Sequence, residues 1–237
     1  MAVTKGAIMA AGEGSRLKTV AEFKPMALVA GRPLISHQMA RMLNAGVEHL
    51  VVAMNSSEKK IDFSSVIEFS NKKVNKIFVD TPSSLHTFWE ISKVLGPTSG
   101  HILASMVDTI VYPKDFQDYL TQCGLLPLDE SMILVTRFID DEKPLTVAID
   151  STQKVSAFGV PLEKNSLVTS GIYCFSAKVL PILSDCVTNG IHKMRNFLAT
   201  LTQMGHPVRV FITEKTIDID RPEDLVVAEK FLKGTNL

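Results

Sequence analysis

Several protein classes are excluded by what this sequence lacks. Its three cysteines, Cys123, Cys174 and Cys186, are odd in number and form no CxxC pair, which argues against a disulfide framework and against a thiolate zinc site. We therefore expect all three to be buried as small hydrophobic residues. Because 25 basic residues are balanced by 25 acidic ones, the chain also lacks the net positive charge of proteins that bind nucleic acid or anionic membranes.

Long apolar runs are absent as well. The longest unbroken run near the N-terminus covers residues 7–11, which is shorter than the roughly 7–15 residues of a signal-peptide core. No segment approaches the ~18 consecutive apolar residues of a membrane span. We therefore expect a soluble, cytoplasmic protein that binds neither nucleic acid nor a membrane.

What the sequence contains is an alternation of strand-like and helix-like segments. The chain of 237 residues fits one large α/β domain or two small ones, and this alternation favours parallel strands joined by crossover helices. Apolar residues in 33–46 recur with helical spacing, and Gly46 suits the end of that helix. The other elements expected in the first half are strands at 5–10, 49–54, 74–79 and 101–107 and a helix at 83–95.

The second half has a different pattern, in which four strand candidates follow one another with short breaks and favour an antiparallel or mixed patch. The expected strands are 131–138, 144–150, 154–160, 166–175 and 207–212, and the expected helices are 177–187, 190–204 and a last one from Pro222 onward. We predict a single domain over residues 1–237. Its fold is a three-layer α/β/α sandwich with a Rossmann-like, mostly parallel sheet and a small antiparallel patch.

A loop with two glycines, AAGEGSRL at 10–17, follows the first strand. Glycines let backbone amides approach a phosphate closely, and a nearby helix N-terminus adds positive potential. The loop is not a dinucleotide fingerprint, because Leu17 stands where GxGxxG/A needs its third small residue, and it is not a Walker A loop. On the loop alone, an ordinary strand-to-helix turn stays open.

The sequence around this loop resembles the sugar nucleotidyltransferases, which include the nucleoside-diphosphate-sugar pyrophosphorylases and phosphocholine-cytidylyltransferase-like members. The family signature is approximately LAAGxGTRL, then a lysine in a Pro/Lys context, then GKPLI and an AGI-then-strand unit. Here GSRL stands at 14–17, Lys24 precedes Pro25, and GRPLI stands at 31–35. Loop, lysine and helix recur in register over residues 5–52.

The resemblance implies that the loop binds an NTP. Backbone amides and Ser15 would lie near its base and phosphates, while Arg16 and Lys24 would neutralise phosphate charge as the catalytic residues. Arginine offers forked donors for this role and lysine a compact mobile charge. The nucleotide-binding residues that the resemblance implies are Ala10, Ala11, Gly12, Gly14, Ser15, Arg16, Lys24 and Ser84.

Two acidic segments are candidates for holding Mg²⁺, which takes one or two carboxylates and fills its other positions with water and phosphate. Asp108 follows a strand, at the end where ligands of open α/β sheets gather, and it matches the family's metal aspartate. Asp218 and Asp220 alternate in TIDIDRPEDL and would point to one side if that segment is extended. We favour Asp218 slightly and leave the choice open, whereas Asp224 suits the first turn of the last helix.

The acceptor half matches the family less closely. Residues 81–87, TPSSLHT, lack a glycine and resemble the serine-leucine version of phosphocholine-cytidylyltransferase-like members. Residues 158–161, FGVP, lack the lysine that meets the sugar phosphate in the family, and we expect Lys164 to be a surface residue. Thr169 and Gly171 stand in TSGIY, which resembles the family's acceptor-side strand, and are the candidate acceptor-binding residues.

Four further side chains are of types that could serve an acceptor site. His86 has no histidine or acidic partner nearby in the sequence, so we expect a polar lining residue rather than a general base. Trp89, Tyr173 and Phe175 are aromatic residues that a choline-like cation would favour, but core packing is the expected role of each.

These observations predict a Mg²⁺-dependent nucleotidyltransferase. It would join an NTP to a sugar-1-phosphate or similar phosphomonoester and release pyrophosphate. The alternative is an inactive nucleotide-binding regulatory or assembly subunit of the same fold, which the altered segments 81–87 and 158–161 motivate. An unrelated Rossmann-type oxidoreductase is excluded by the missing third glycine. The base, the acceptor and the formation of a homo-oligomer stay open.

Overall fold

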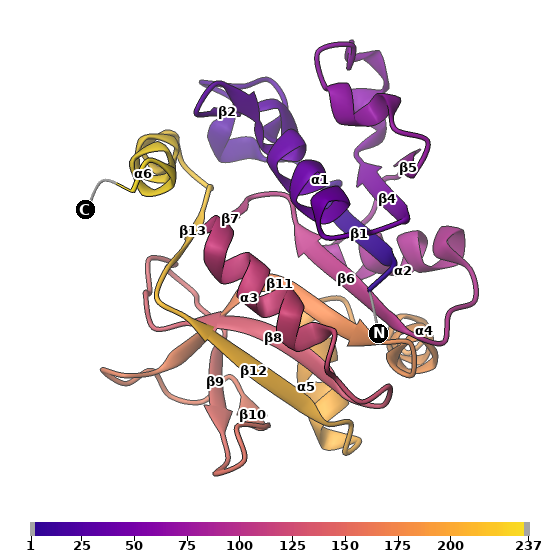
Figure 1. Ribbon diagram of the computed structural model, residues 1–237, viewed down its shortest axis with the longest axis vertical. Coiled ribbons are helices and arrows are strands. Elements are labelled where there is room, and N and C mark those ends of the chain that lie inside the picture. Colours follow the sequence, from indigo (N-terminus) through magenta and orange to yellow (C-terminus); the bar gives the residue numbers. More distant parts are fainter. Residues whose placement is uncertain (1–2, 235–237) are drawn as a thin grey trace.

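The parallel half of the central sheet is built around the first strand (Figure 1). The computed structural model describes residues 3–234 of the chain. In it β1 (Lys5–Ala10) lies between β4 (His49–Met54) and β6 (His101–Met106), parallel to both, and β5 (Val74–Phe78) pairs parallel with β4. Parallel neighbours need crossover connections that cover the sheet, which explains why the central strands β1, β4 and β6 are largely buried, whereas the edge strand β5 carries exposed polar residues.

The other half of the sheet contains the predicted antiparallel patch. The long strand β11 (Leu167–Ser176) pairs antiparallel with β6 and with β8 (Ser131–Thr136), and β12 (Val208–Thr213) pairs parallel with β8. The hairpin of β9 (Thr146–Ile149) and β10 (Val155–Phe158) extends from the start of β11.

Helices cover both faces of the sheet and complete three layers (Figure 1). On one face lie α1 (Leu34–Asn44) and α3 (Pro113–Cys123), and on the other α2 (Ser84–Leu95), α4 (Val179–Thr188) and α5 (Met194–Gln203). Helix α6 (Pro222–Leu232) extends the first of these layers at the edge of the molecule, where it packs against β2 and β13. Successive strand residues point to opposite faces, so Ile8 belongs to the first core and Ala7 to the second. The α/β/α prediction is confirmed.

Some local elements differ from the sequence expectation. Helix α3 was not predicted, and it buries Phe116, Tyr119 and Cys123 on one face. Helix α5 begins later than the predicted 190, because Gly190 takes a φ of 79° and ends α4. The short elements are η1 (Ser15–Leu17), η2 (Lys24–Met26), β2 (Leu28–Val29), β3 (Arg32–Pro33), η3 (Ser56–Lys60) and η4 (Ile67–Ser70).

A small second sheet lies beyond the carboxyl end of β6. Strand β7 (Thr109–Val111) pairs antiparallel with β13 (Thr216–Asp218), and Thr109 stands opposite Asp218. The Ile219 amide then donates to the Asp108 carbonyl over 3.1 Å. This pairing brings two acidic segments that are far apart in the sequence to the same edge of the molecule.

All three cysteines are free and buried, as predicted. Within residues 3–234, no helix is long and apolar enough to cross a membrane.

Candidate active site

The loop after β1 is shaped by a close contact between Gly14 and Lys24. Gly14 has a φ of 55°, in the left-handed region that favours glycine. A Cβ at this position would lie 2.4 Å from the Cβ of Lys24, which is closer than two carbon atoms approach. Glycine is therefore needed here so that the lysine can pass beside the loop, a constraint additional to the phosphate approach expected from the sequence.

The ammonium group of Lys24 joins the two acidic segments. Its Nζ lies 2.6 Å from Asp108 Oδ2 and 2.7 Å from Asp220 Oδ1. Burial lowers the pKa of Lys24, but the two carboxylates outweigh burial and raise the pKa above its usual value. Arg16 approaches Asp220 from the exposed side, with its Nη1 3.6 Å from Oδ2. Both cations predicted from the sequence thus lie at the acidic cluster.

Asp218 is oriented by a neighbour that the sequence reasoning missed. The Thr109 hydroxyl, on the buried side of β7, donates to Asp218 Oδ1 over 2.8 Å. Ile217 and Ile219 are buried on the other side, so Asp218 and Asp220 face the same way, as their alternation predicted. Enclosure by the surrounding protein, and then the Asp108 carboxylate, raise the pKa of Asp218 to about 7. Its outer surface still opens to solvent in a cleft.

These donors fit a hard divalent cation. Asp108 and Asp218 supply two carboxylates whose mutual repulsion a divalent ion would relieve, and Mg²⁺ uses one or two such ligands. Among the described residues, no group of three or more His, Cys, Asp or Glu side chains is arranged to hold a metal by itself. A Mg²⁺ ion at this place would therefore need water and phosphate oxygens to complete its coordination.

Of the clefts that border the glycine loop, two contain most of the predicted nucleotide-binding residues. The first, which we call the central cleft, has a volume of about 310 Å³, and the second, the serine cleft, of about 730 Å³. The predicted residues that line the central cleft are Gly12, Gly14, Ser15, Arg16, Lys24, Asp108 and Asp220. Those that line the serine cleft are Ala11, Gly12 and Ser84. Ser84 begins α2, whose N-cap is Ser83, so a helix N-terminus faces this cleft.

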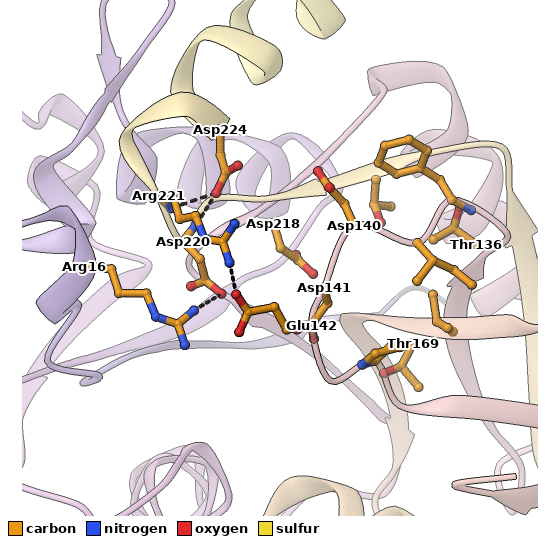
Figure 2. A pocket seen from close by; sticks show the side chains of 15 residues that line it. Arg16, Thr136, Asp140, Asp141, Glu142, Thr169, Asp218, Asp220, Arg221 and Asp224 are labelled. Carbon is orange, nitrogen blue, oxygen red and sulfur yellow. Dashed lines mark hydrogen bonds and ion pairs between the residues drawn. The ribbon is translucent and has the colours of Figure 1, made fainter. Parts of the chain in front are cut away.

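A third cleft, the acidic cleft, adjoins the central cleft through Arg16 and Asp220, which line both (Figure 2). Among the residues predicted for the site it also contains Asp218 and Thr169. Its remaining charged residues are Asp140, Asp141, Glu142, Arg221 and Asp224. As expected, Asp224 belongs to the first turn of α6, where its carboxylate accepts the backbone amides of Asp220 and Arg221.

Two predicted residues line none of these clefts. Ala10 is buried at the end of β1. Gly171 has a φ of 71°, and a Cβ there would lie 2.9 Å from both Thr109 Oγ1 and Met106 Cγ. Gly171 therefore lies directly behind the hydroxyl that orients Asp218, and its absence of a side chain makes room for that threonine.

His86 differs from the sequence expectation. It lines none of the three clefts, and its ring stacks on His192 with the centroids 5.3 Å apart. Its Nδ1 lies 2.9 Å from Ser83 Oγ. The histidine partner comes from the segment before α5, so no spacing in the sequence near His86 signals it.

The other side chains are placed as expected. Tyr173 and Phe175 are buried in the second core, and Trp89 packs against the same core with part of its ring exposed. Lys164 is exposed. None of the three aromatic residues lines the acidic cleft.

The family model of the nucleotidyl transferases matches residues 5–234, and the chain belongs to this family. The bifunctional IPC transferase and DIPP synthase of Aquifex aeolicus is 24% identical over 240 residues, covering 98% of this chain and 53% of the relative. The mannose-1-phosphate guanylyltransferase catalytic subunit beta of Drosophila melanogaster is 23% identical over 232 residues, covering 94% of this chain and 61% of the relative. The chain thus spans little more than half the length of these curated relatives.

Solved structures show the same fold. The inositol-1-phosphate CTP transferase from T. maritima has a TM-score of 0.76 at 15% identity, with 100% of this chain and 99% of that chain covered. A UDP-glucose pyrophosphorylase complexed with UDP-glucose has a TM-score of 0.79 at 13% identity, with 99% and 100% covered. Fold and family therefore agree with the resemblance seen at the glycine loop.

Proposed function

We propose that this chain transfers a nucleotidyl group from an NTP to the phosphate of a sugar-1-phosphate or similar phosphomonoester and releases pyrophosphate. The observation that carries the proposal is the position of Lys24, between Asp108 and Asp220 and directly beside the glycine loop. Family membership supports the same reaction class. Relatives named for mannose-1-phosphate and inositol-1-phosphate support a phosphomonoester as the acceptor.

The NTP is bound across the serine and central clefts. Its base lies in the serine cleft, beside Ala11 and the first turn of α2 at Ser84. Its phosphates lie in the central cleft against the backbone amides of Gly12 and Gly14 and the Ser15 hydroxyl. Ala10 supports this loop from the core as the last residue of β1.

Asp108 and Asp218 hold the Mg²⁺ ion in this proposal. Asp220 is the weaker candidate for the second ligand, because its two carboxylate oxygens already face Lys24 and Arg16. Asp218, in contrast, accepts a hydrogen bond from the neutral Thr109 hydroxyl. When bound, Mg²⁺ offsets the charge that develops on the phosphate oxygens of the NTP.

The chemical step needs position and positive charge rather than a strong base. A phosphate oxygen of the acceptor, already anionic, attacks the α-phosphorus of the NTP in line. A new P–O bond forms there, and the bond to the bridging oxygen breaks as pyrophosphate leaves with its electron pair. Arg16 and Lys24 neutralise the charge on the reacting phosphates, and the geometry of the clefts holds the two substrates together. Thr169, which lines the acidic cleft, lies on the acceptor side, and Gly171 supports the site from behind Thr109.

The test is Mg²⁺-dependent pyrophosphate release with CTP, UTP, GTP, ATP and dTTP, each combined with sugar-1-phosphates, inositol-1-phosphate and phosphocholine. We expect release with at least one pair, and its loss in Asp108→Ala. Asp118→Ala removes an exposed acid on α3 that pairs with Lys114 and should keep the rate. Comparing Asp218→Asn with Asp220→Asn identifies the second metal ligand. NTP binding without pyrophosphate release from any pair would instead support the inactive subunit.

A further inference from the structure

An ion pair spans the acidic cleft between two segments that lie far apart in the sequence. Arg221, the residue before α6, donates through Nη2 to Oε1 of Glu142 in the loop between β8 and β9 (Figure 2). Both side chains are half exposed or more, at 50% and 64%. Ion pairs with this exposure contribute little to stability because water and salt screen them. Arg221 is therefore free to exchange Glu142 for another anion at small cost.

The cleft offers few cations to a phosphate. Arg16 and Arg221 are the only basic side chains among the described residues that line it. Figure 2 shows the guanidinium ends of both directed at acidic side chains, Arg16 at Asp220 and Arg221 at Glu142. Lys24, in the adjoining central cleft, is already paired with Asp108 and Asp220. Of these cations, only Arg221 is paired with an acid that is not a candidate metal ligand.

The acceptor of the proposed reaction brings a phosphate dianion into this cleft, and that dianion needs a partner. The segment 158–161 contains no basic residue, and Lys164 is exposed and does not line the cleft. A guanidinium group offers paired donors that match phosphate oxygens, and it already binds a carboxylate of similar shape here. The Glu142 carboxylate thus occupies the position on Arg221 that a phosphate group would take.

We propose that Arg221 binds the phosphate of the acceptor and that Glu142 is a displaceable internal anion that competes for the same guanidinium. This inference rests on the proposed function, since it assigns the acceptor side of that reaction. It makes Arg221 a specificity-determining residue for phosphomonoesters. It also predicts that Glu142 weakens acceptor binding in the wild type.

The backbone of Arg221 is held in register with the acidic cluster. Asp224 Oδ2 accepts the amide of Arg221 at 2.7 Å and that of Asp220 at 2.9 Å. The main chain from which the Arg221 side chain extends is therefore anchored next to the metal-binding segment. Asp224 acts as a positioning residue through these two amides.

The experiment compares the wild type with Arg221→Gln, Glu142→Gln and the double variant. One readout is the KM of the acceptor against the KM of the NTP, using the substrate pair found by pyrophosphate release. The other is the affinity for inorganic phosphate by calorimetry, which requires no turnover. Arg221→Gln should weaken phosphate and acceptor binding about tenfold, as expected for lost charge-assisted hydrogen bonds, with the KM of the NTP unchanged. Glu142→Gln should strengthen both and have no effect once Arg221 is replaced.

A matched control separates the effect of the Arg221–Glu142 ion pair from the effect of the total negative charge of the cleft. Asp140→Asn removes one negative charge from the same loop and the same cleft without touching the Arg221 pair, so it should change phosphate affinity much less than Glu142→Gln. The proposal is overturned if Glu142→Gln and Arg221→Gln weaken phosphate binding to the same extent. That result is expected if the ion pair only holds the loop in place. The proposal is also overturned if neither variant changes phosphate affinity. Absence of pyrophosphate release by the wild type would reject the proposed function, while phosphate affinity would still decide the role of Arg221.

Discussion

The Nζ of Lys24 lies 2.6 Å from Oδ2 of Asp108, so the first residue of η2, beside the glycine loop, and a residue just after β6 form a close ion pair. Asp220 completes this arrangement from the C-terminal segment, 2.7 Å from the same nitrogen. Three distant parts of the chain therefore meet at one ammonium group. Because Lys24 is only 10% exposed, water screens these interactions weakly, and the lysine affects both stability and the proposed chemistry.

Replacing Lys24 by methionine should impair both properties. The change leaves Asp108 and Asp220 without their shared cation, and we expect a loss of about 1–3 kcal/mol in the free energy of unfolding, the cost of a charge-assisted hydrogen bond left unmade. If Lys24 stabilises charge on the reacting phosphates, kcat should fall about 10²–10³-fold. Urea unfolding and pyrophosphate release measure the two effects. Lys18→Met, at an exposed position of the same loop, is the control, and an unchanged kcat in Lys24→Met would contradict the assignment.

Gly14→Ala should destabilise the loop by about 1–3 kcal/mol, since it combines left-handed backbone strain with a steric overlap. The added methyl would lie 2.4 Å from Lys24 Cβ. Gly12→Ala is the matched control, because a Cβ at Gly12 meets nothing within 4 Å. Denaturant unfolding of the two variants should therefore differ clearly. Equal stability would mean that the loop rearranges without cost and that glycine is not needed beside Lys24.

Thr109→Val tests whether the threonine orients Asp218. It removes the hydroxyl that donates over 2.8 Å from a residue that is 1% exposed, while keeping the volume nearly constant. We expect a loss of about 1 kcal/mol in stability and a higher Mg²⁺ concentration at half-maximal activity. Thr109→Ser retains the hydroxyl and should restore the Mg²⁺ dependence. A Thr109→Val protein with wild-type Mg²⁺ dependence would show that Asp218 needs no such donor.

The raised pKa of the buried Glu58 side chain should make the stability of the protein depend on pH. This side chain is 2% exposed, its Oε2 has no hydrogen-bond partner among the described residues, and burial raises its pKa from 4.5 to about 7. Between these values the folded protein binds more protons at Glu58 than the unfolded chain does. Stability should therefore fall as pH rises from 4.5 to about 7, by up to ~1.4 kcal/mol per pH unit.

Glu58→Gln should reduce this decline, because the amide keeps an acceptor for the Asn55 backbone amide and carries no charge. What remains should include the contribution of Asp218, whose pKa is also raised to about 7. Urea midpoints of the wild type and the variant, measured across the same pH range, test the effect. Glu48→Gln, at an exposed position, should follow the wild type. Parallel pH curves for Glu58→Gln and the wild type would place the titrating group elsewhere.

Much of the fold is predictable from local patterns. Buried strands such as 49–54 and the helix 83–95 are recognisable because side-chain periodicity and capping residues act within a few positions. Helix α3 was missed although its buried face is regular. The strand before it ends at Val111, and Pro113 at the first helical position was the available start signal.

The sequence by itself determined the α/β layers and the glycine loop, since these depend on local periodicity and on residue types at short spacing, and its resemblance to the family indicated Lys24 and the acidic segments. Only the tertiary structure decided which of them meet. The pairing of β7 with β13 places Thr109 opposite Asp218, and loop packing joins Arg221 to Glu142. Such long-range partners are selected by sheet register and by the burial of whole elements, so no short stretch of sequence specifies them.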